Sequence, residues 1–150
     1  MPSARPRVAI NGFGRIGRAF ARLRAIDPTC PFDLVAVNDL ADPEALAYLL
    51  ELDSVHGHAP APVALHGSKL HIGDVAVEVL AEREPTKLPW KRLGVDLVVE
   101  STGRFRGRKA AAAHLEAGAH KVILSAPGTS DDPPDRTVVL GINHGTLQPT

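Results

Sequence analysis

Short apolar runs alternate along the chain with segments whose apolar residues recur at helical spacing. The runs expected to form buried strands are residues 8–10, 34–37, 97–99, 122–124 and 138–140. Helices are predicted from Arg15, from an N-cap at Asp42, and over Gly107–Ala117. Because unbroken apolar strands between helices are typical of a parallel sheet covered on both faces, the pattern predicts an α/β domain.

The first predicted helix has one apolar face. The residues on that face are Ile16, Ala19, Phe20, Leu23 and Ile26. The residues largely off it are Arg15, Arg18, Arg22 and Arg24. We therefore expect the apolar face to pack on the sheet and the arginines to form a solvated face.

The middle of the chain departs from the parallel pattern. Residues 63–80 contain short alternating stretches separated by His66-Gly67-Ser68 and by Gly73-Asp74, which are hairpin signals. We expect a small antiparallel excursion there. Residues 127–134 have the composition of a loop, and no internal repeat interrupts the chain, so residues 1–150 are interpreted as one domain.

Charge and composition narrow the classes of partner. Lys plus Arg total 17 and Asp plus Glu total 17, so the formal net charge is zero. This balance argues against a nucleic-acid partner and gives no support for an anionic membrane partner. The sequence has no apolar run of spanning length and no signal-peptide core, and Cys30 is its single cysteine. A cytoplasmic domain without a disulfide framework is the expectation.

The first strand runs into a glycine-rich turn. Gly12, Gly14 and Gly17 form a Gly-x-Gly-x-x-Gly pattern between a predicted strand and a predicted helix. Such glycines allow a tight turn, close approach of a pyrophosphate and close packing of the helix, whose first amides face the phosphates. Asp39 ends the next strand, where a carboxylate accepts from the ribose hydroxyls and repels a 2′-phosphate. The combination predicts a Rossmann-type doubly wound fold that binds NAD in preference to NADP.

A longer ordered set of motifs resembles one family. The motifs are residues 11–18 (NGFGRIGR), 37–40 (VNDL), 52–57 (LDSVHG), 82–85 (EREP), 93–96 (LGVD), 100–105 (ESTGRF) and 141–144 (GINH). Together they resemble the N-terminal, NAD-binding half of phosphorylating glyceraldehyde-3-phosphate dehydrogenase. The resemblance implies an oxidoreductase of glycolysis that oxidises and phosphorylates glyceraldehyde 3-phosphate with hydride transfer to NAD. It also implies a homotetramer in which a catalytic domain follows this one.

The resemblance assigns cofactor-binding roles residue by residue. The residues implied are Asn11, Gly12, Phe13, Gly14, Arg15, Ile16, Gly17, Asn38, Asp39, Arg83, Ser101, Thr102, Gly103, Phe105, Ser125 and Ala126. The backbone amides of Arg15 and Ile16 would lie beneath the pyrophosphate, and Asn11 would orient that loop. Arg83 would border the adenine. The loop containing Thr102 and the strand end at Ser125 would approach the nicotinamide side.

No catalytic residue is assigned to this sequence. The family's nucleophilic cysteine lies in a Ser-Asn-Ala-Ser-Cys-Thr-Thr segment, and this sequence stops at Thr150 without it. Cys30 is expected at the opposite edge of the sheet from the cofactor and is interpreted as inert. His56 and His58 form the only close histidine pair, without a third ligand at suitable spacing, so no metal site is assigned. Arg104 stands where the family usually has an aliphatic residue.

Two alternatives remain beside the triose-phosphate enzyme. The coenzyme domain of erythrose-4-phosphate dehydrogenase is similar, although the motifs at residues 52–57 and 100–103 look more like the triose enzyme. A stand-alone module that binds NAD and performs no chemistry is the alternative from a different class. In either case the 150 residues are expected to be inactive alone.

Overall fold

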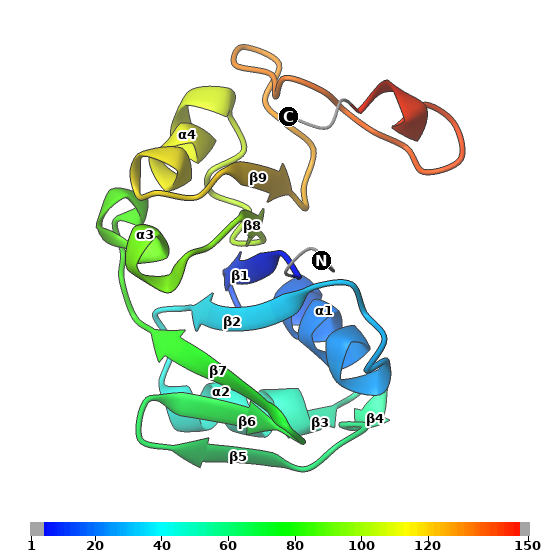
Figure 1. Ribbon diagram of the computed structural model, residues 1–150, viewed down its shortest axis with the longest axis vertical. Helices are drawn as coiled ribbons and strands as arrows, with labels where there is room; N and C mark the ends of the chain where they lie inside the picture. The colour runs from blue at the N-terminus through cyan, green and yellow to red at the C-terminus, as the bar shows by residue number, and fades with distance from the viewer. Residues whose placement is uncertain (1–4, 148–150) are drawn as a thin grey trace.

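The computed structural model describes residues 5–147, and a seven-stranded sheet forms its centre (Figure 1). The strands are β1 Arg7–Asn11, β2 Asp33–Asn38, β3 Leu52–Asp53, β4 Gly57–His58, β5 Val63–His66, β6 Lys69–Ile72, β7 Val75–Leu80, β8 Leu97–Glu100 and β9 Lys121–Leu124. The α-helices are α1 Arg15–Ile26, α2 Pro43–Glu51, α3 Trp90–Leu93 and α4 Arg108–Glu116, and two 3-10 turns cover Pro85–Lys87 and His144–Thr146.

The strand order confirms the doubly wound, mainly parallel sheet. The order is β5-β6-β7-β2-β1-β8-β9, and β7, β2, β1, β8 and β9 run parallel. The chain leaves β1 toward β2 on one side and returns to β8 on the other, so the order reverses at β1. In open α/β sheets, ligands bind outside the carboxyl ends of the strands at such a reversal. The expected antiparallel excursion is also present, as β5, β6 and the antiparallel pairing of β6 with β7.

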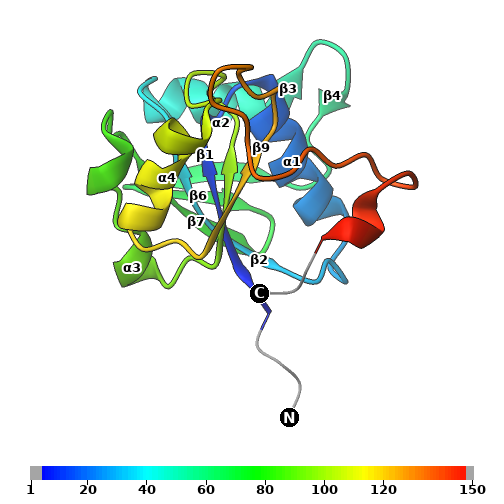
Figure 2. The same cartoon turned by 90° about the horizontal axis from the view of Figure 1, so that it is seen from above.

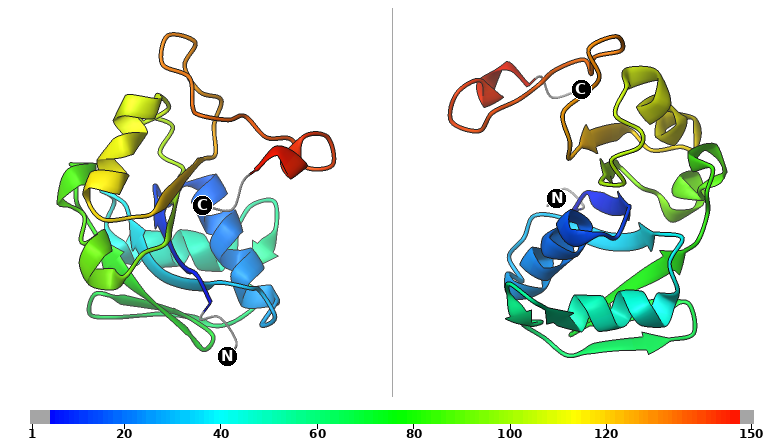
Figure 3. Two further views of the ribbon diagram at one scale, coloured as in Figure 1. Left: turned by 45° about the horizontal axis from the view of Figure 1, so that its top comes forward. Right: turned by 180° about the vertical axis from the view of Figure 1, so that it is seen from behind.

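Helices cover both faces of the sheet (Figure 2). On the face of α1 and α2, Ile10 and Val99 pack with Leu50 in the larger core. On the face of α3 and α4, Ala9 and Val98 pack around Trp90. Successive residues of a strand thus serve opposite cores, which is why the central strands are apolar without interruption. Figure 3 shows α2 lying across the β5–β7 hairpins.

Helix α1 packs only in part through the face that its hydrophobic pattern predicted, because Phe20 packs on the larger core but the other large apolar side chains of that face do not. Ile16, Leu23 and Ile26 are 56–61% exposed, whereas Gly17, Ala21 and Arg22 are buried. The guanidinium of Arg22 donates to the carbonyls of Leu50 (2.5 and 2.9 Å), Glu51 (3.1 Å) and Gly57 (3.0 Å). It therefore satisfies the carbonyls at the end of α2, and the small residues beside it let α1 approach the sheet closely.

One further local prediction needs correction. Residues 138–140 form no strand, and Val139 and Leu140 are 50% and 86% exposed. These residues lie on a segment that leads away from the sheet (Figure 1), so they neither pair with β9 nor join either core. Residues 52–58, which follow α2, contain the two-residue antiparallel ladder of β3 and β4.

The loop at residues 127–134 has a definite structural role. Gly107 is the N-cap residue of α4, and it has no side chain that could accept from the first amides of the helix. Asp132 supplies one from the loop, because its Oδ2 accepts from the backbone N–H of Lys109 at 2.8 Å. A Cβ on Gly107 would lie 2.5 Å from the same Oδ2, so glycine there leaves room for the carboxylate. The loop is thus fastened to the N-terminus of α4.

Candidate functional site

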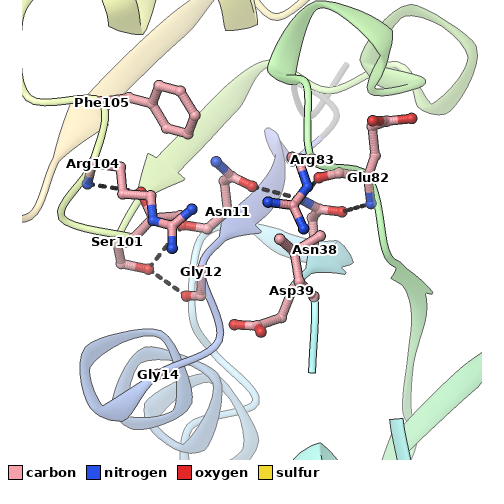
Figure 4. A pocket seen from close by; sticks show the side chains of 12 residues that line it. Asn11, Gly12, Gly14, Asn38, Asp39, Glu82, Arg83, Ser101, Arg104 and Phe105 are labelled. Carbon is pink, nitrogen blue, oxygen red and sulfur yellow. Dashed lines mark hydrogen bonds between the residues drawn. The ribbon is translucent and has the colours of Figure 1, made fainter. Parts of the chain in front are cut away.

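A cavity of about 270 Å³ opens at the carboxyl ends of β1, β2, β7 and β8 (Figure 4). Its walls come from four separate turns of the chain. The lining residues are Asn11, Gly12, Gly14, Asn38, Asp39, Leu40, Glu82, Arg83, Ser101, Thr102, Arg104 and Phe105. This is the edge at which the topology places a ligand.

The three glycines of the Gly-x-Gly-x-x-Gly turn do different things. Gly12 has φ +93°, and a Cβ there would lie 2.5 Å from the backbone nitrogen of Thr102. A Cβ on Gly17 would lie 2.3 Å from the carbonyl oxygen of Gly12, so this glycine lets α1 pack against the turn. Gly14 has no atom within 4 Å of where its Cβ would be. Gly12 and Gly17 are therefore required by the fold, whereas Gly14 leaves open space at the cavity.

The N-terminus of α1 opens at this cavity. Gly14 is its N-cap residue, and no side chain caps the helix. The amides of the first turn therefore have no intrahelical acceptor, and the helix dipole adds a partial positive charge at the same point. The arrangement suits an anion such as a phosphate.

Asp39 lies across the turn from the helix. Its Oδ2 accepts from the backbone N–H of Phe13 at 2.7 Å, and its Oδ1 accepts from the backbone N–H of Ala41 at 3.0 Å. These bonds fix the carboxylate at the cavity wall and leave further lone pairs to accept from a ligand. The side chain of Phe13 is fully buried in the core, so this residue serves the site through its backbone.

Buried polar side chains form the floor of the cavity. Asn38 donates to Asn11 at 2.7 Å, Asn11 donates to Glu100 at 2.6 Å, and His114 lies 2.8 Å from the same carboxylate. Burial raises the pKa of Glu100, but hydrogen bonds from His114, Thr102 and Asn11 outweigh it and hold that pKa below its ordinary value. Glu100 is therefore a buried carboxylate that stays ionised.

The structure gathers nine of the residues expected at the site around this cavity. They are Asn11, Gly12, Gly14, Asn38, Asp39, Arg83, Ser101, Thr102 and Phe105. The expected residues that do not line it are Phe13, Arg15, Ile16, Gly17, Gly103, Ser125 and Ala126. Arg15 and Ile16 lie in the first turn of α1, where their amides rather than their side chains are relevant. Ser125 and Ala126 follow β9, farther along the same edge of the sheet.

Residues beyond the sequence-based set also belong to the site. Leu40, Glu82 and Arg104 line the cavity, and each stands next to or within a motif already recognised in the sequence. Within residues 5–147, neither Arg83 nor Arg104 has a side-chain ion pair or hydrogen bond. The buried partners of Glu100 carried no sequence signal, because His114 falls in an alanine-rich helix and meets the acid only through the fold.

Three other observations concern metal binding, membrane insertion and the single cysteine. Among residues 5–147, no three His, Cys, Asp or Glu side chains gather closely enough to hold a metal ion. No helix in that range is long and apolar enough to cross a bilayer. Cys30 lies before β2 at the amino end of the strands, away from the cavity.

Comparison with known proteins agrees with this geometry. The family model described as glyceraldehyde 3-phosphate dehydrogenase, NAD binding domain, matches residues 6–108. Glyceraldehyde-3-phosphate dehydrogenase of Geobacillus stearothermophilus is 50% identical over 143 residues, which are 95% of this chain and 41% of that protein. The Thermotoga maritima enzyme is 49% identical over 143 residues, covering 95% of this chain and 42% of that protein. Glyceraldehyde-3-phosphate dehydrogenase 1 of Bacillus subtilis is 51% identical over 138 residues, covering 92% and 40%.

The chain thus spans about two fifths of the length of these relatives. The matched part holds the glycine turn, Asp39 and the cavity. The chain belongs to the glyceraldehyde 3-phosphate dehydrogenase family and corresponds to its NAD-binding domain.

Proposed function

We propose that residues 1–150 act as a single NAD-binding domain and that the cavity holds the cofactor. The observation that carries the proposal is the uncapped N-terminus of α1 opening beside Gly14, with the Asp39 carboxylate opposite. A dinucleotide has an anionic pyrophosphate that suits the N-terminus of α1 and ribose hydroxyls that suit the Asp39 carboxylate. The open space at Gly14, which a side chain would fill, fits such a group.

Different residues at the site suit different parts of NAD. The amides of Arg15 and Ile16 would donate to the pyrophosphate, and Asp39 would accept from the adenosine ribose. Arg83 would border the adenine, and Thr102 and Phe105 would lie toward the nicotinamide. Ser125 and Ala126 remain proposed contacts at the far end, near the nicotinamide ribose.

The chemistry that this site serves is the oxidation and phosphorylation of glyceraldehyde 3-phosphate. Bound NAD would supply the hydride acceptor, while this chain's residues hold and orient it. The reaction also needs a thiolate, and Cys30 lies at the wrong edge of the sheet. We propose that the thiolate comes from a catalytic domain outside these 150 residues, in a cytoplasmic homotetramer. The exposed apolar side chains of Ile16, Leu23 and Ile26 support contact with further protein.

Gly14→Val is the sharpest test of the cofactor site. The valine has open space in the structure, so the fold should persist, but its side chain would stand where the pyrophosphate is proposed to lie. Calorimetric titration should show NAD binding to the original chain and at least a tenfold weaker affinity in the variant. Gly12→Val is unsuitable for this purpose, because its Cβ would collide with the backbone of Thr102. Equal affinity in the original chain and Gly14→Val would remove the glycine turn from the site.

Asp39 tests the choice of cofactor. Losing a charge-assisted hydrogen bond costs about 1.5–3 kcal/mol, or roughly ten- to a hundred-fold in affinity. Asp39→Ala should weaken NAD by that factor and leave NADP unchanged or improved, because repulsion of the 2′-phosphate is lost with the carboxylate. The measurement is a pair of dissociation constants for each protein. Equal binding of NAD and NADP by the original chain would contradict the proposed role.

A further inference from the structure

We propose that Glu100 is the positioning residue of the cavity, acting as an obligatory anion on which two chains of hydrogen bonds converge. Three strand ends lie side by side in register: Asn38 is opposite Asn11, and Asn11 is opposite Glu100. We call these three residues the polar row. Each is at most 4% exposed. The inference rests on the proposed NAD site, because the polar row forms its floor.

One chain of hydrogen bonds reaches Glu100 along the polar row. The backbone N–H of Glu82 donates to Asn38 Oδ1 at 2.8 Å. Asn38 Nδ2 donates to Asn11 Oδ1 at 2.7 Å, and Asn11 Nδ2 donates to Glu100 Oε2 at 2.6 Å. Asn38 Nδ2 also donates to the Glu82 carbonyl at 2.8 Å, and the bonds along the polar row itself all run toward Glu100.

The second chain reaches the same oxygen from the helices behind the sheet. The indole Nε1–H of Trp90 donates to His114 Nδ1 at 3.0 Å. That ring nitrogen must then be unprotonated, so the proton of neutral His114 lies on Nε2. His114 Nε2 is 2.8 Å from Glu100 Oε2 and donates to it. Both Trp90 and His114 are fully buried.

The two chains have a fixed direction because each begins at a group that can only donate. An indole N–H and a backbone N–H have no lone pair to offer. The His114 ring cannot exchange its tautomer without setting two donors face to face, and neither amide of the polar row can turn over for the same reason. The oxygen at the point of convergence must therefore accept only, and because the other oxygen of Glu100 also faces a backbone N–H, the side chain must be an ionised carboxylate.

The other carboxylate oxygen, Glu100 Oε1, connects this hydrogen-bond network to the cavity wall. Glu100 Oε1 accepts from the backbone N–H of Thr102 at 2.8 Å and also from the Thr102 hydroxyl. Thr102, Asn11 and Asn38 all line the cavity. One buried charge thus holds the ends of β1 and β2 and the turn after β8 in one arrangement. Removing that charge should disturb the shape of the cavity without removing any atom from its surface.

Glu100→Gln tests this inference, because it keeps the size of the side chain and replaces an acceptor by a donor. At either position the new amide group would face donors. We expect NAD affinity to fall at least tenfold in calorimetric titration while cooperative thermal unfolding persists. Glu116→Gln is the matched control, because Glu116 is exposed on α4 and should leave affinity unchanged. Unchanged affinity in Glu100→Gln would overturn the proposal.

A second variant separates a directed network from simple loss of packing. Trp90→Phe removes the donor that fixes the His114 tautomer, so in the Glu100→Gln background the ring can reverse and accept from the new amide. We expect Glu100→Gln to cost at least threefold less affinity in Trp90→Phe than in the original chain. A merely structural role for Glu100 predicts equal costs in the two backgrounds, and that result would contradict the inference.

Nitrogen chemical shifts of the His114 ring provide a measurement that needs neither the variants nor NAD. In the original chain they should show Nδ1 unprotonated and Nε2 protonated. The opposite tautomer, or a doubly protonated ring at neutral pH, would overturn the inference even if the variants fail to fold. Absence of NAD binding would instead count against the proposed function, and the ring measurement would still decide the direction of the network.

Discussion

The polar row and the segment after β9 start from the same edge of the sheet but are built in opposite ways. The polar row is charged, buried and hydrogen-bonded to its neighbours at 2.6–2.8 Å. The C-terminal segment, residues 125–147, carries apolar side chains that remain exposed, with Leu140 and Ile142 at 86% and 81% (Figure 1, orange to red). Polarity alone therefore does not decide which residues are inside. Hydrogen-bond partners inside the fold explain the burial of the polar row. The C-terminal segment leads away from the sheet and contributes to neither hydrophobic core, so its apolar side chains stay exposed.

The largest effect is expected from acid, which should destabilise the chain through the polar row. Protonated Glu100 can no longer accept from both chains of hydrogen bonds that meet at its carboxylate. The pKa of Glu100 in the folded chain lies below its ordinary value of 4.5. Its contribution to stability is therefore complete above about pH 4.5 and is lost as pH falls through the lower folded pKa. Denaturant unfolding at a series of pH values should show a steep loss in this window for the original chain.

Glu100→Gln should be less stable at neutral pH and less sensitive to acid. Some acid dependence should remain, because backbone hydrogen bonds from His56 and Val55 also lower the pKa of Asp53. Glu116→Gln should follow the original chain. If Glu100→Gln lost stability as steeply as the original chain when the pH falls below 4.5, Glu100 would not be the titrating group.

Sequence patterns were sufficient where an element and its partner are both marked locally. The parallel strands, the excursion at residues 63–80, the cap at Asp42 and the glycine turn were all predicted, and the Asp42 side chain does accept from the backbone N–H of Ala45. Most of the cavity wall was also predicted, because glycines and strand-end acids carry a direct chemical signal.

The errors arose where tertiary partners override the local pattern. The hydrophobic periodicity of α1 favoured Ile16 and Leu23 as its buried face, but Arg22 is buried instead because carbonyls at the end of α2 lie within its reach. The apolar run at residues 138–140 resembled a strand but pairs with no strand of the sheet. His114 gave no signal, because its partner Glu100 is 14 residues away and is brought to it only by folding.

A matched pair of valine truncations measures the contrast between the two regions directly. Val98 is fully buried in β8, whereas Val139 in the C-terminal segment is 50% exposed. Val98→Ala should destabilise the chain by about 2 kcal/mol, because it leaves a cavity among packed neighbours. Val139→Ala should change stability by less than about 0.5 kcal/mol. Equal losses in denaturant unfolding would mean that residues 138–140 pack in solution.

A loss of stability smaller than that of Val98→Ala is expected where the C-terminal segment is fastened to the body of the domain. Asp132 Oδ2 accepts from the backbone N–H of Lys109, and the Asp132 carbonyl accepts from the backbone N–H of Arg108 at 3.1 Å. Asp132→Ala removes only the side-chain bond, so it should cost about 1 kcal/mol, as loss of a helix N-cap does. Asp132→Asn keeps an acceptor oxygen and should cost less, although it loses the favourable interaction of the charge with the helix dipole.

Asp131→Ala is the neighbouring control, because Asp131 is exposed. Hydrogen exchange of the Lys109 amide should quicken in Asp132→Ala and not in Asp131→Ala. Equal exchange in both variants would show that the Asp132 side chain does not cap α4, and the contacts of Arg108 with Asp135 (2.6 Å) and with the Asp132 carbonyl would then be what fastens the segment to the helix.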